Sequence, residues 1–218
     1  MSNLLNNKRV IIFDFDGLLV NTEDIYLQGW VKSLEKYSLI VPEQLLSSFS
    51  GKSIEEVDSI LHTQGISFQM LQQVRECREK YIKDMIESST ITLLPGVKEF
   101  LKSTFFKYKL AICSSSPRKR LETILDSLGI LNYFDKIVAY EDTVEHKPSP
   151  MPYKKFIEYY GIHKSKIVVF EDSCSGIISA QANGIETYCV NELLTSDLLK
   201  LDSIKSYYKN FYEVMREL

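Results

Sequence analysis

Short apolar runs alternate with segments of helical spacing along most of the chain, and this alternation constrains the fold more than any other sequence feature. Each run is rich in β-branched residues and has the length of a strand that is buried on both faces. Four clear runs and one weaker run occur, at residues 10–13, 110–113, 137–139, 167–170 and 187–190. Strand and helix alternating at this pitch predict βαβ units. The expected fold class is therefore α/β, with a Rossmann-like, doubly wound parallel sheet.

The segments between these runs have apolar residues three and four positions apart, which is typical of helices with one buried face. In one of them Tyr153, Phe156 and Tyr160 form such a stripe, and a glycine follows as a helix stop. The C-terminal stretch 198–211 is rich in Leu, Tyr and Phe. We expect that stretch to close the sheet and to pack against the core.

One interval breaks the alternation, because residues 21–88 contain no convincing strand. Their pattern predicts helices at 24–37, 42–48, 53–64 and 67–87. In the third helix, Ile54, Val57 and Leu61 form a stripe that we expect to be buried.

The sheet pattern resumes after the turn-like sequence Leu94-Pro95-Gly96. The chain is therefore predicted to consist of an α/β core, residues 1–20 and 89–218, and a helical domain, residues 21–88, inserted after the first strand. Hinges between the two are expected near residues 20–21 and 88–94.

Composition and charge exclude several classes of protein. The chain has 218 residues, of which 44% are apolar and 25% charged, as in ordinary globular proteins. The net charge of −3 gives no basic excess, so we expect neither a nucleic-acid nor a membrane partner. No segment approaches the ~20 apolar residues of a spanning helix. The four cysteines lack C-x-x-C spacing, which predicts free thiols and a cytoplasmic location. No large apolar stripe is left unexplained, so we expect a monomer.

Carboxylates, serines and a lysine follow the predicted strands at the points where the strands end. In chain order they are Asp14, Asp16, Ser114, Ser115, Lys147, Glu171 and Asp172. Because ligands bind beyond the carboxyl ends of strands in open parallel sheets, we expect these side chains to converge. Clustered carboxylates without histidine favour Mg²⁺, which also contacts substrate phosphates. A carboxylate beside Mg²⁺ can attack phosphorus, and a second one can protonate the leaving group.

Four motifs in this set resemble those of the haloacid dehalogenase (HAD) superfamily. Asp14-Phe15-Asp16-Gly17 resembles the first motif, and Ser114 stands where the second has Ser or Thr. Lys147-Pro148-Ser149-Pro150 resembles the third motif, and Glu171-Asp172 the fourth. The motifs occur in the family's order, and the resemblance covers nearly the whole chain. The inserted helices resemble the cap of the subgroup that contains β-phosphoglucomutase, phosphoglycolate phosphatase and sugar-phosphate phosphatases.

The resemblance implies that Asp14 is the nucleophile and also a Mg²⁺ ligand. It implies that Asp16 is the general acid and base, with its backbone carbonyl on the metal. True dehalogenases lack this Asp-x-Asp pair, and phosphonatases typically have a small residue at the second position. Asp16 therefore favours phosphate-ester chemistry.

The resemblance also assigns the remaining motif residues to binding. Ser114 and Lys147 would bind the transferring phosphoryl group, with Ser115 as a neighbouring backbone donor. Asp172 would ligate Mg²⁺, and Glu171 would do so directly or through water. Read without the family, Glu171 and Asp172 are acids at a helix N-terminus, which the helix dipole favours. Ser115, like the serine after it, can be read as a cap of the helix that begins near Pro117.

Two residues of the predicted cap are candidate substrate contacts. Glu23 lies just after the first hinge, and Lys52 belongs to Gly51-Lys52-Ser53, which resembles the family's substrate-contacting loop. The β-phosphoglucomutases usually carry a histidine shortly after the first hinge, where this chain has Tyr26. The sequence therefore favours a phosphatase over a mutase.

We expect a Mg²⁺-dependent phosphatase that acts on a small phosphomonoester, such as a sugar phosphate. A β-phosphoglucomutase-like sugar phosphomutase is the first alternative. A non-catalytic phosphate-binding module is the second, and the intact pair Asp14 and Asp16 argues against it. Cys113 is excluded as a nucleophile, because cysteine-dependent phosphatases have an arginine six positions later and this chain has Lys119.

Overall fold

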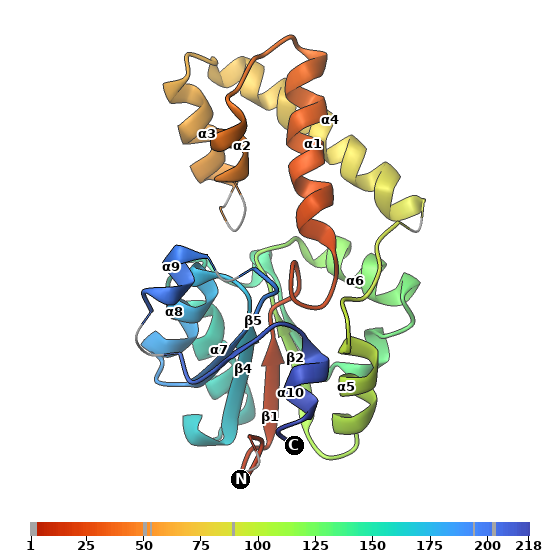
Figure 1. Ribbon diagram of the computed structural model, residues 1–218, viewed down its shortest axis with the longest axis vertical. Coiled ribbons are helices and arrows are strands. Elements are labelled where there is room, and N and C mark those ends of the chain that lie inside the picture. Colours follow the sequence, from red (N-terminus) through yellow and green to blue (C-terminus); the bar gives the residue numbers. More distant parts are fainter. Residues whose placement is uncertain (1–3, 50–51, 53, 89, 194, 202–203) are drawn as a thin grey trace. The chain divides into compact units, whose positions relative to one another are not determined.

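The computed structural model describes residues 4–49, 52, 54–88, 90–193, 195–201 and 204–218. The chain forms two compact units (Figure 1). Met1–Val20 and Thr92–Leu218 make up the first unit, and Asn21–Ile91 make up the second. The assignment of these units as a catalytic core and a cap stays a prediction.

In the described chain, six strands of the first unit form one parallel sheet, in the order β3-β2-β1-β4-β5-β6. The strands are β1 (Val10–Phe13), β2 (Lys109–Cys113), β3 (Lys136–Val138), β4 (Ile167–Glu171), β5 (Glu186–Val190) and β6 (Tyr207–Tyr208). The helices are α5 (Val97–Thr104), α6 (Arg118–Ser127), α7 (Met151–Tyr160), α8 (Cys174–Ala182), α9 (Ser196–Leu199) and α10 (Phe211–Met215), with one-turn 3₁₀ helices at Leu131–Tyr133, Tyr140–Asp142 and Lys164–Lys166. The predicted α/β fold with a parallel sheet is confirmed.

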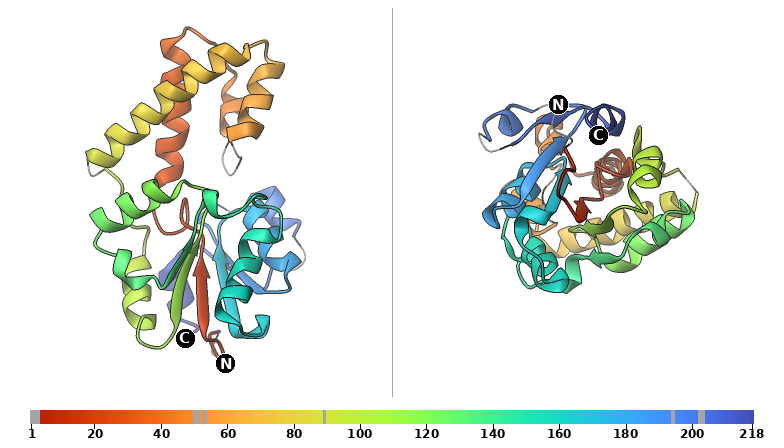
Figure 2. Two further views of the ribbon diagram at one scale, coloured as in Figure 1. Left: turned by 180° about the vertical axis from the view of Figure 1, so that it is seen from behind. Right: turned by 90° about the horizontal axis from the view of Figure 1, so that it is seen from below.

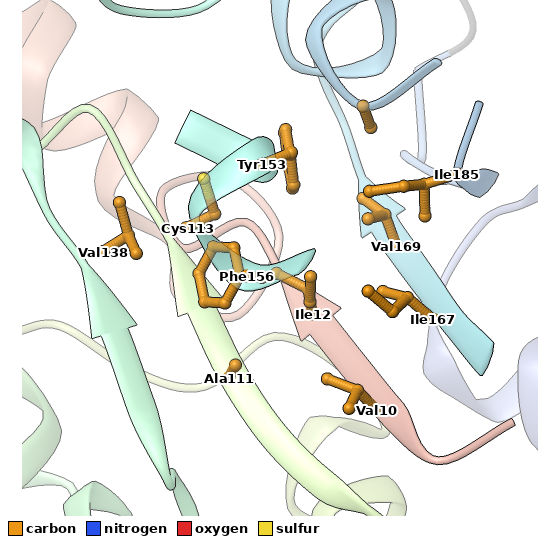
Figure 3. Packing of buried hydrophobic residues seen from close by; sticks show 11 residues of the cluster. Val10, Ile12, Ala111, Cys113, Val138, Tyr153, Phe156, Ile167, Val169 and Ile185 are labelled. Atoms are coloured by element: carbon orange, nitrogen blue, oxygen red, sulfur yellow. The ribbon is translucent and has the colours of Figure 1, made fainter. Parts of the chain in front are cut away.

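The central strand β1 is apolar at every position because both of its faces are covered. Val10 and Ile12 belong to one buried cluster, together with Phe156 of α7 (Figure 3). On the other face, the ring of Phe13 lies 5.9 Å from Phe100 of α5 and 5.9 Å from Phe211 of α10, measured between centroids. A strand buried on both sides has no polar alternation, which explains the continuous apolar run.

The helices cover the two faces of the sheet in two groups. Helices α5 and α6 lie on one face, and α7 and α8 lie on the other (Figures 1 and 2). Since βαβ crossovers are almost always right-handed, the change of face follows from the reversal of strand order beside β1. The carboxyl ends of β1 and β4 therefore meet at the topological switch point, where sheets of this kind bind ligands.

The second unit is helical in its described residues. Its helices are α1 (Thr22–Lys36), α2 (Glu43–Ser47), α3 (Ile54–Thr63) and α4 (Phe68–Glu87). Its own apolar core includes Trp30, Val57, Leu61 and Val74. The prediction that Ile54 is buried is wrong, because this residue is 38% exposed in the first turn of α3. The buried stripe of that helix begins one turn later, at Val57.

The C-terminal stretch extends the sheet, as expected. Strand β6 pairs in parallel with β5, and Phe211 is buried against the core. All four cysteines are free, which confirms that expectation. Among the described helices, none combines the length and the apolar character needed to cross a bilayer.

Candidate active site

Asp14 and Asp16 stand at the carboxyl end of β1 because the strand continues directly into a tight turn. The Asp14 amide still donates to the carbonyl of Phe170 on β4, at 3.0 Å. Gly17 has φ +78°, a backbone conformation that favours glycine, and its amide donates to the carbonyl of Val20 at 3.0 Å. The strand fixes the Asp14 carboxylate, and the turn fixes that of Asp16.

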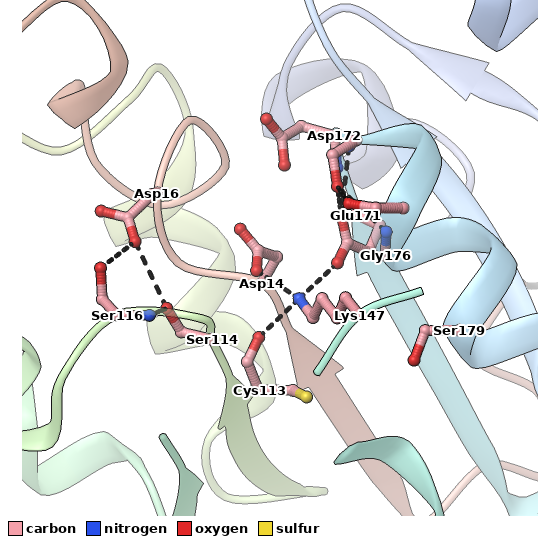
Figure 4. A network of polar contacts seen from close by, with 12 residues as sticks. Asp14, Asp16, Cys113, Ser114, Ser116, Lys147, Glu171, Asp172, Gly176 and Ser179 are labelled. Carbon is pink, nitrogen blue, oxygen red and sulfur yellow. Dashed lines mark hydrogen bonds and ion pairs between the residues drawn. The ribbon is translucent and has the colours of Figure 1, made fainter. Parts of the chain in front are cut away.

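The ammonium group of Lys147 joins the ends of three strands. Its Nζ donates to Asp14 Oδ1 at 2.5 Å, to Glu171 Oε1 at 2.6 Å and to the carbonyl of Cys113 at 2.9 Å (Figure 4). These bonds use all three of its donors. Only 5% of the Lys147 side chain is exposed. Lys147 therefore neutralises charge at the site rather than on the surface.

Glu171 is completely buried and accepts hydrogen bonds on both carboxylate oxygens. Oε1 accepts from Lys147 and, at 2.9 Å, from the hydroxyl of Tyr153. Oε2 accepts from the amides of Asp172 and Ser173 at 3.1 Å each, and from the Ser173 hydroxyl at 3.0 Å. Five donors on a carboxylate with about four lone-pair sites leave little capacity for another ligand.

Helix α8 can begin beside Glu171 because of two small residues. Ser173 is the N-cap of α8 and accepts from the amide of Gly176 at 3.2 Å. A Cβ atom at Gly176 would overlap the Glu171 carboxylate. The Glu171 carboxylate therefore lies against the first turn of α8, which agrees with its reading as an acid at a helix N-terminus, and its contact with a metal stays a prediction.

Asp16 contacts two serines at the end of β2. Ser116 Oγ donates to Asp16 Oδ2 at 2.7 Å, and Ser114 Oγ donates to the same oxygen at 3.3 Å (Figure 4). Ser114 and Ser116 are both buried, and Ser115 is exposed. Reading Ser115 or Ser116 as the cap of α6 is wrong, because Pro117 is its N-cap and the first amide of the helix, that of Arg118, donates to Glu141 Oε2 at 3.0 Å.

Burial controls the electrostatics of the site. It raises the pKa of Asp14 to about 8, and the opposing charge of Lys147 only partly offsets that rise. Burial also disfavours the Lys147 ammonium, but the charges of Asp14 and Glu171 outweigh it and hold the pKa of Lys147 well above its ordinary value. Burial raises the pKa of the Cys113 thiol to about 12, which agrees with its exclusion as a nucleophile.

Asp14, Glu171 and Asp172 form a carboxylate cluster that fits a hard cation. One carboxylate oxygen from each lies within 4.8 Å of the other two, and all three residues are buried. The donor set consists of oxygens, as Mg²⁺ prefers. The side-chain Nδ2 of Asn191 ties this edge of the sheet together by donating to the carbonyl of Asp172 at 3.1 Å.

The two candidate contacts of the predicted cap belong to the other unit. Glu23 is partly exposed in the first turn of α1, and Lys52 is exposed. The neighbours of Lys52 in the predicted loop, Gly51 and Ser53, lie outside the described residues. Both substrate contacts stay predictions.

Tyr153 and Ser116 are among the contacts of the site that sequence reasoning missed. The helical stripe correctly indicated that Tyr153 is buried, but nothing in a stripe indicates that its hydroxyl reaches Glu171. Ser116 was visible only as one serine of a loop. Its contact with Asp16 depends on the parallel pairing of β1 with β2, which brings the two loops together.

Comparison with known proteins places this chain in a family. Residues 11–190 match the model of the haloacid dehalogenase-like hydrolases. The chain is 30% identical over 183 residues to a phosphorylated carbohydrates phosphatase of Thermotoga maritima, covering 81% of this chain and 82% of that one. It is 28% identical over 184 residues to the fructose-1-phosphate phosphatase YqaB of Escherichia coli, covering 84% and 96%.

The fold has relatives among solved structures as well. A Thermotoga maritima structure, assigned provisionally as a beta-phosphoglucomutase, has a TM-score of 0.77 and 28% identity, covering 95% of this chain and 97% of that one. The chain therefore belongs to the haloacid dehalogenase-like hydrolase family and is an enzyme of the hydrolase class. The family predicted from the four motifs is confirmed.

Proposed function

We propose that this hydrolase is a Mg²⁺-dependent phosphatase that cleaves a small phosphomonoester, such as a sugar phosphate, through an aspartyl-phosphate on Asp14. The observation that carries the proposal is the position of Lys147 between Asp14 and Glu171, with Asp172 completing the carboxylate cluster. The names of the two relatives, a carbohydrate phosphatase and a fructose-1-phosphate phosphatase, support this substrate class.

In the proposed first step, a carboxylate oxygen of Asp14 attacks phosphorus while the bond from phosphorus to the leaving oxygen breaks. Asp16 gives its proton to that oxygen, so that an alcohol leaves. Lys147 opposes the rise that burial causes in the pKa of Asp14, and a bound Mg²⁺ would favour the anion further; Lys147 also offers positive charge to the phosphoryl oxygens. Ser114 and the backbone of Ser115 are proposed as further donors to those oxygens.

In the proposed second step, water attacks the phosphorus of the aspartyl-phosphate. Asp16 now accepts a proton from the water, and the bond from phosphorus to Asp14 breaks to release inorganic phosphate. The same carboxyl group thus ends the cycle protonated, ready for the next leaving group.

Mg²⁺ would be held by Asp14 and Asp172, and when bound it would supply positive charge that polarises the phosphoryl group. The hydrogen bonds already on Glu171 favour contact between that carboxylate and the ion through water. By the family resemblance, residues 21–88 would act as the cap, with Glu23 and Lys52 as substrate contacts.

Release of inorganic phosphate from a panel of sugar phosphates, in Mg²⁺ and in EDTA, tests the proposal. We expect turnover in Mg²⁺, none in EDTA, and none from Asp14→Asn in either. Significant Mg²⁺-dependent turnover by Asp14→Asn would contradict the assignment of the nucleophile.

A sugar phosphomutase is the second candidate, because a structure provisionally assigned as such an enzyme is 28% identical to this chain. In that reaction the phosphoryl group on Asp14 passes to a sugar hydroxyl instead of water. The same panel, assayed for isomerised sugar phosphate besides free phosphate, separates the two functions.

A further inference from the structure

Tyr153 contacts both partners of the ion pair between Lys147 and Glu171. Its hydroxyl donates to Glu171 Oε1 at 2.9 Å, and the same oxygen accepts from Lys147 Nζ at 2.6 Å. Lys147 Nζ also lies 5.2 Å from the centroid of the Tyr153 ring, which is within the range of a cation–π contact. We propose that Tyr153 is a positioning residue that secures Glu171 while Lys147 turns toward the transferring phosphoryl group. This inference rests on the proposed function, in which Lys147 offers its charge to that group.

The core of the first unit fixes the ring of Tyr153. The residue is 0% exposed and belongs to the buried cluster that contains Ile12, Cys113 and Phe156. Figure 3 shows Tyr153 and Cys113 at the end of this cluster toward which the strands point. A ring in such close packing has few alternative orientations, so its hydroxyl is held in one place. Tyr153 therefore gives Glu171 a hydrogen bond whose position is set by the core and not by the loop that carries Lys147.

The ammonium group of Lys147 has all of its hydrogen bonds in use. It is a compact charge on a flexible stem, and its three donors are directed to Asp14 Oδ1, Glu171 Oε1 and the carbonyl of Cys113. A phosphoryl oxygen can therefore receive a hydrogen bond from Lys147 only when one of these three acceptors is released. The proposed reaction thus requires an exchange of partners at Nζ.

Glu171 can release Lys147 because other donors remain on both of its carboxylate oxygens. Oε2 accepts from three donors, and Oε1 accepts from Tyr153 as well as from Lys147. After the exchange the carboxylate keeps four donors for about four lone-pair sites. Without the Tyr153 hydroxyl, Oε1 would lose both of these donors, and a buried carboxylate oxygen without a donor is costly. The hydroxyl therefore lowers the energy of the state in which Lys147 contacts the phosphoryl group.

Tyr153→Phe removes the hydroxyl and keeps the ring, so this variant isolates the proposed contact. Tyr188→Phe is the matched control, because Tyr188 is also buried and its hydroxyl also donates to a carboxylate, Glu186 Oε1, at 2.5 Å. Glu186 is the first residue of β5, at the end of the strand opposite the site. Both variants lose one hydrogen bond to a carboxylate, so a general loss of stability would affect them alike.

The substrate is p-nitrophenyl phosphate, and the two inhibitors are inorganic phosphate and orthovanadate, at a Mg²⁺ concentration that saturates each variant. Inorganic phosphate resembles the ground state, whereas orthovanadate adopts the five-coordinate geometry of phosphoryl transfer and resembles the transition state. We expect Tyr153→Phe to lower kcat about tenfold and to raise the Ki of orthovanadate about tenfold. KM and the Ki of inorganic phosphate should change less than about threefold, because the exchange at Lys147 accompanies transfer and not substrate binding.

The control Tyr188→Phe should leave all four quantities within about twofold of their values in the unaltered protein. Equal weakening of phosphate and orthovanadate by Tyr153→Phe, or an unchanged kcat, would overturn the positioning role and leave the proposed function intact. The same kinetic loss in Tyr188→Phe would overturn it as well. Absence of Mg²⁺-dependent phosphate release by the unaltered protein would instead contradict the proposed function, so the two failures are distinguishable.

Discussion

The Nζ atom of Lys147 lies 2.5 Å from Oδ1 of Asp14, and both side chains are almost completely shielded from solvent. The same ammonium lies 2.6 Å from Oε1 of Glu171. One cation thus compensates two buried carboxylates, and the carbonyl of Cys113 occupies its third donor. The stability of this edge of the sheet and the charge of the proposed nucleophile therefore depend on one side chain.

We expect Lys147→Met to destabilise the protein by about 3–5 kcal/mol, because it leaves buried carboxylates without their countercharge. Phosphatase activity should fall at least about 10²-fold, since a preorganised charge is lost from the reacting group. Urea unfolding and phosphate release measure the two effects. Lys154→Met is the control, because within the described part of the chain the ion pair of Lys154 is with the exposed Glu158 of the same helix, at 3.7 Å. An unchanged urea midpoint for Lys147→Met would contradict the burial argument.

Gly176→Ala should destabilise the protein by about 1–3 kcal/mol, the usual cost of overpacking, because the added methyl group would overlap the Glu171 carboxylate. Thermal unfolding followed by circular dichroism measures this effect. Ile178→Ala, at a 43% exposed residue two positions later in α8, is the matched control and should have a smaller effect. Equal melting temperatures for Gly176→Ala and the unaltered protein would show that Glu171 can move without cost.

Mg²⁺ should stabilise the folded protein, because the carboxylate cluster exists only when the ends of β1 and β4 are together. A ligand at a hundred times its Kd contributes about 2.7 kcal/mol. We expect a higher melting temperature in Mg²⁺ than in EDTA, and Asp172→Asn should remove most of the difference. Asp142→Asn, whose carboxylate contacts Arg118 outside the cluster, should retain it. A full Mg²⁺ response in Asp172→Asn would place the ion elsewhere.

The strands and the site motifs were predictable because each has a local signal. Residues 10–13 are apolar throughout because β1 is covered on both faces, and the acids follow directly at its end. Strand β6 has only two residues, Tyr207–Tyr208, and two residues carry no periodicity. Ile54 was predicted to be buried because an apolar stripe indicates which face of a helix is covered, but not where along the helix the cover begins.

The polar contacts within the site were not predictable, because they are decided by packing between distant segments. The Tyr153 hydroxyl reaches Glu171 across 18 positions of sequence, and Ser116 reaches Asp16 across 100. Tyr153 satisfies an apolar helical pattern and Ser116 satisfies a loop pattern, whether or not these contacts form. Local pattern thus indicates which residues are chemically suited to the site, and tertiary structure decides which oxygen each one contacts.

Glu186 contributes to the loss of stability in acid. Burial would raise its pKa, but hydrogen bonds from Tyr188 at 2.5 Å and Lys8 at 3.0 Å outweigh burial, so the pKa lies below its ordinary value of 4.5. A carboxyl group with a lowered pKa in the folded state stabilises the protein above its unfolded-state pKa, and this stabilisation is lost as pH falls through the folded-state pKa. We therefore expect Glu186→Gln to reduce the difference between the free energies of unfolding at about pH 6 and about pH 3.5, measured in urea.

Glu99→Gln is the control for this prediction, because it changes an exposed residue of α5, and it should leave that difference unchanged. Equal behaviour of the two variants would contradict a role for the Lys8 and Tyr188 contacts in acid stability.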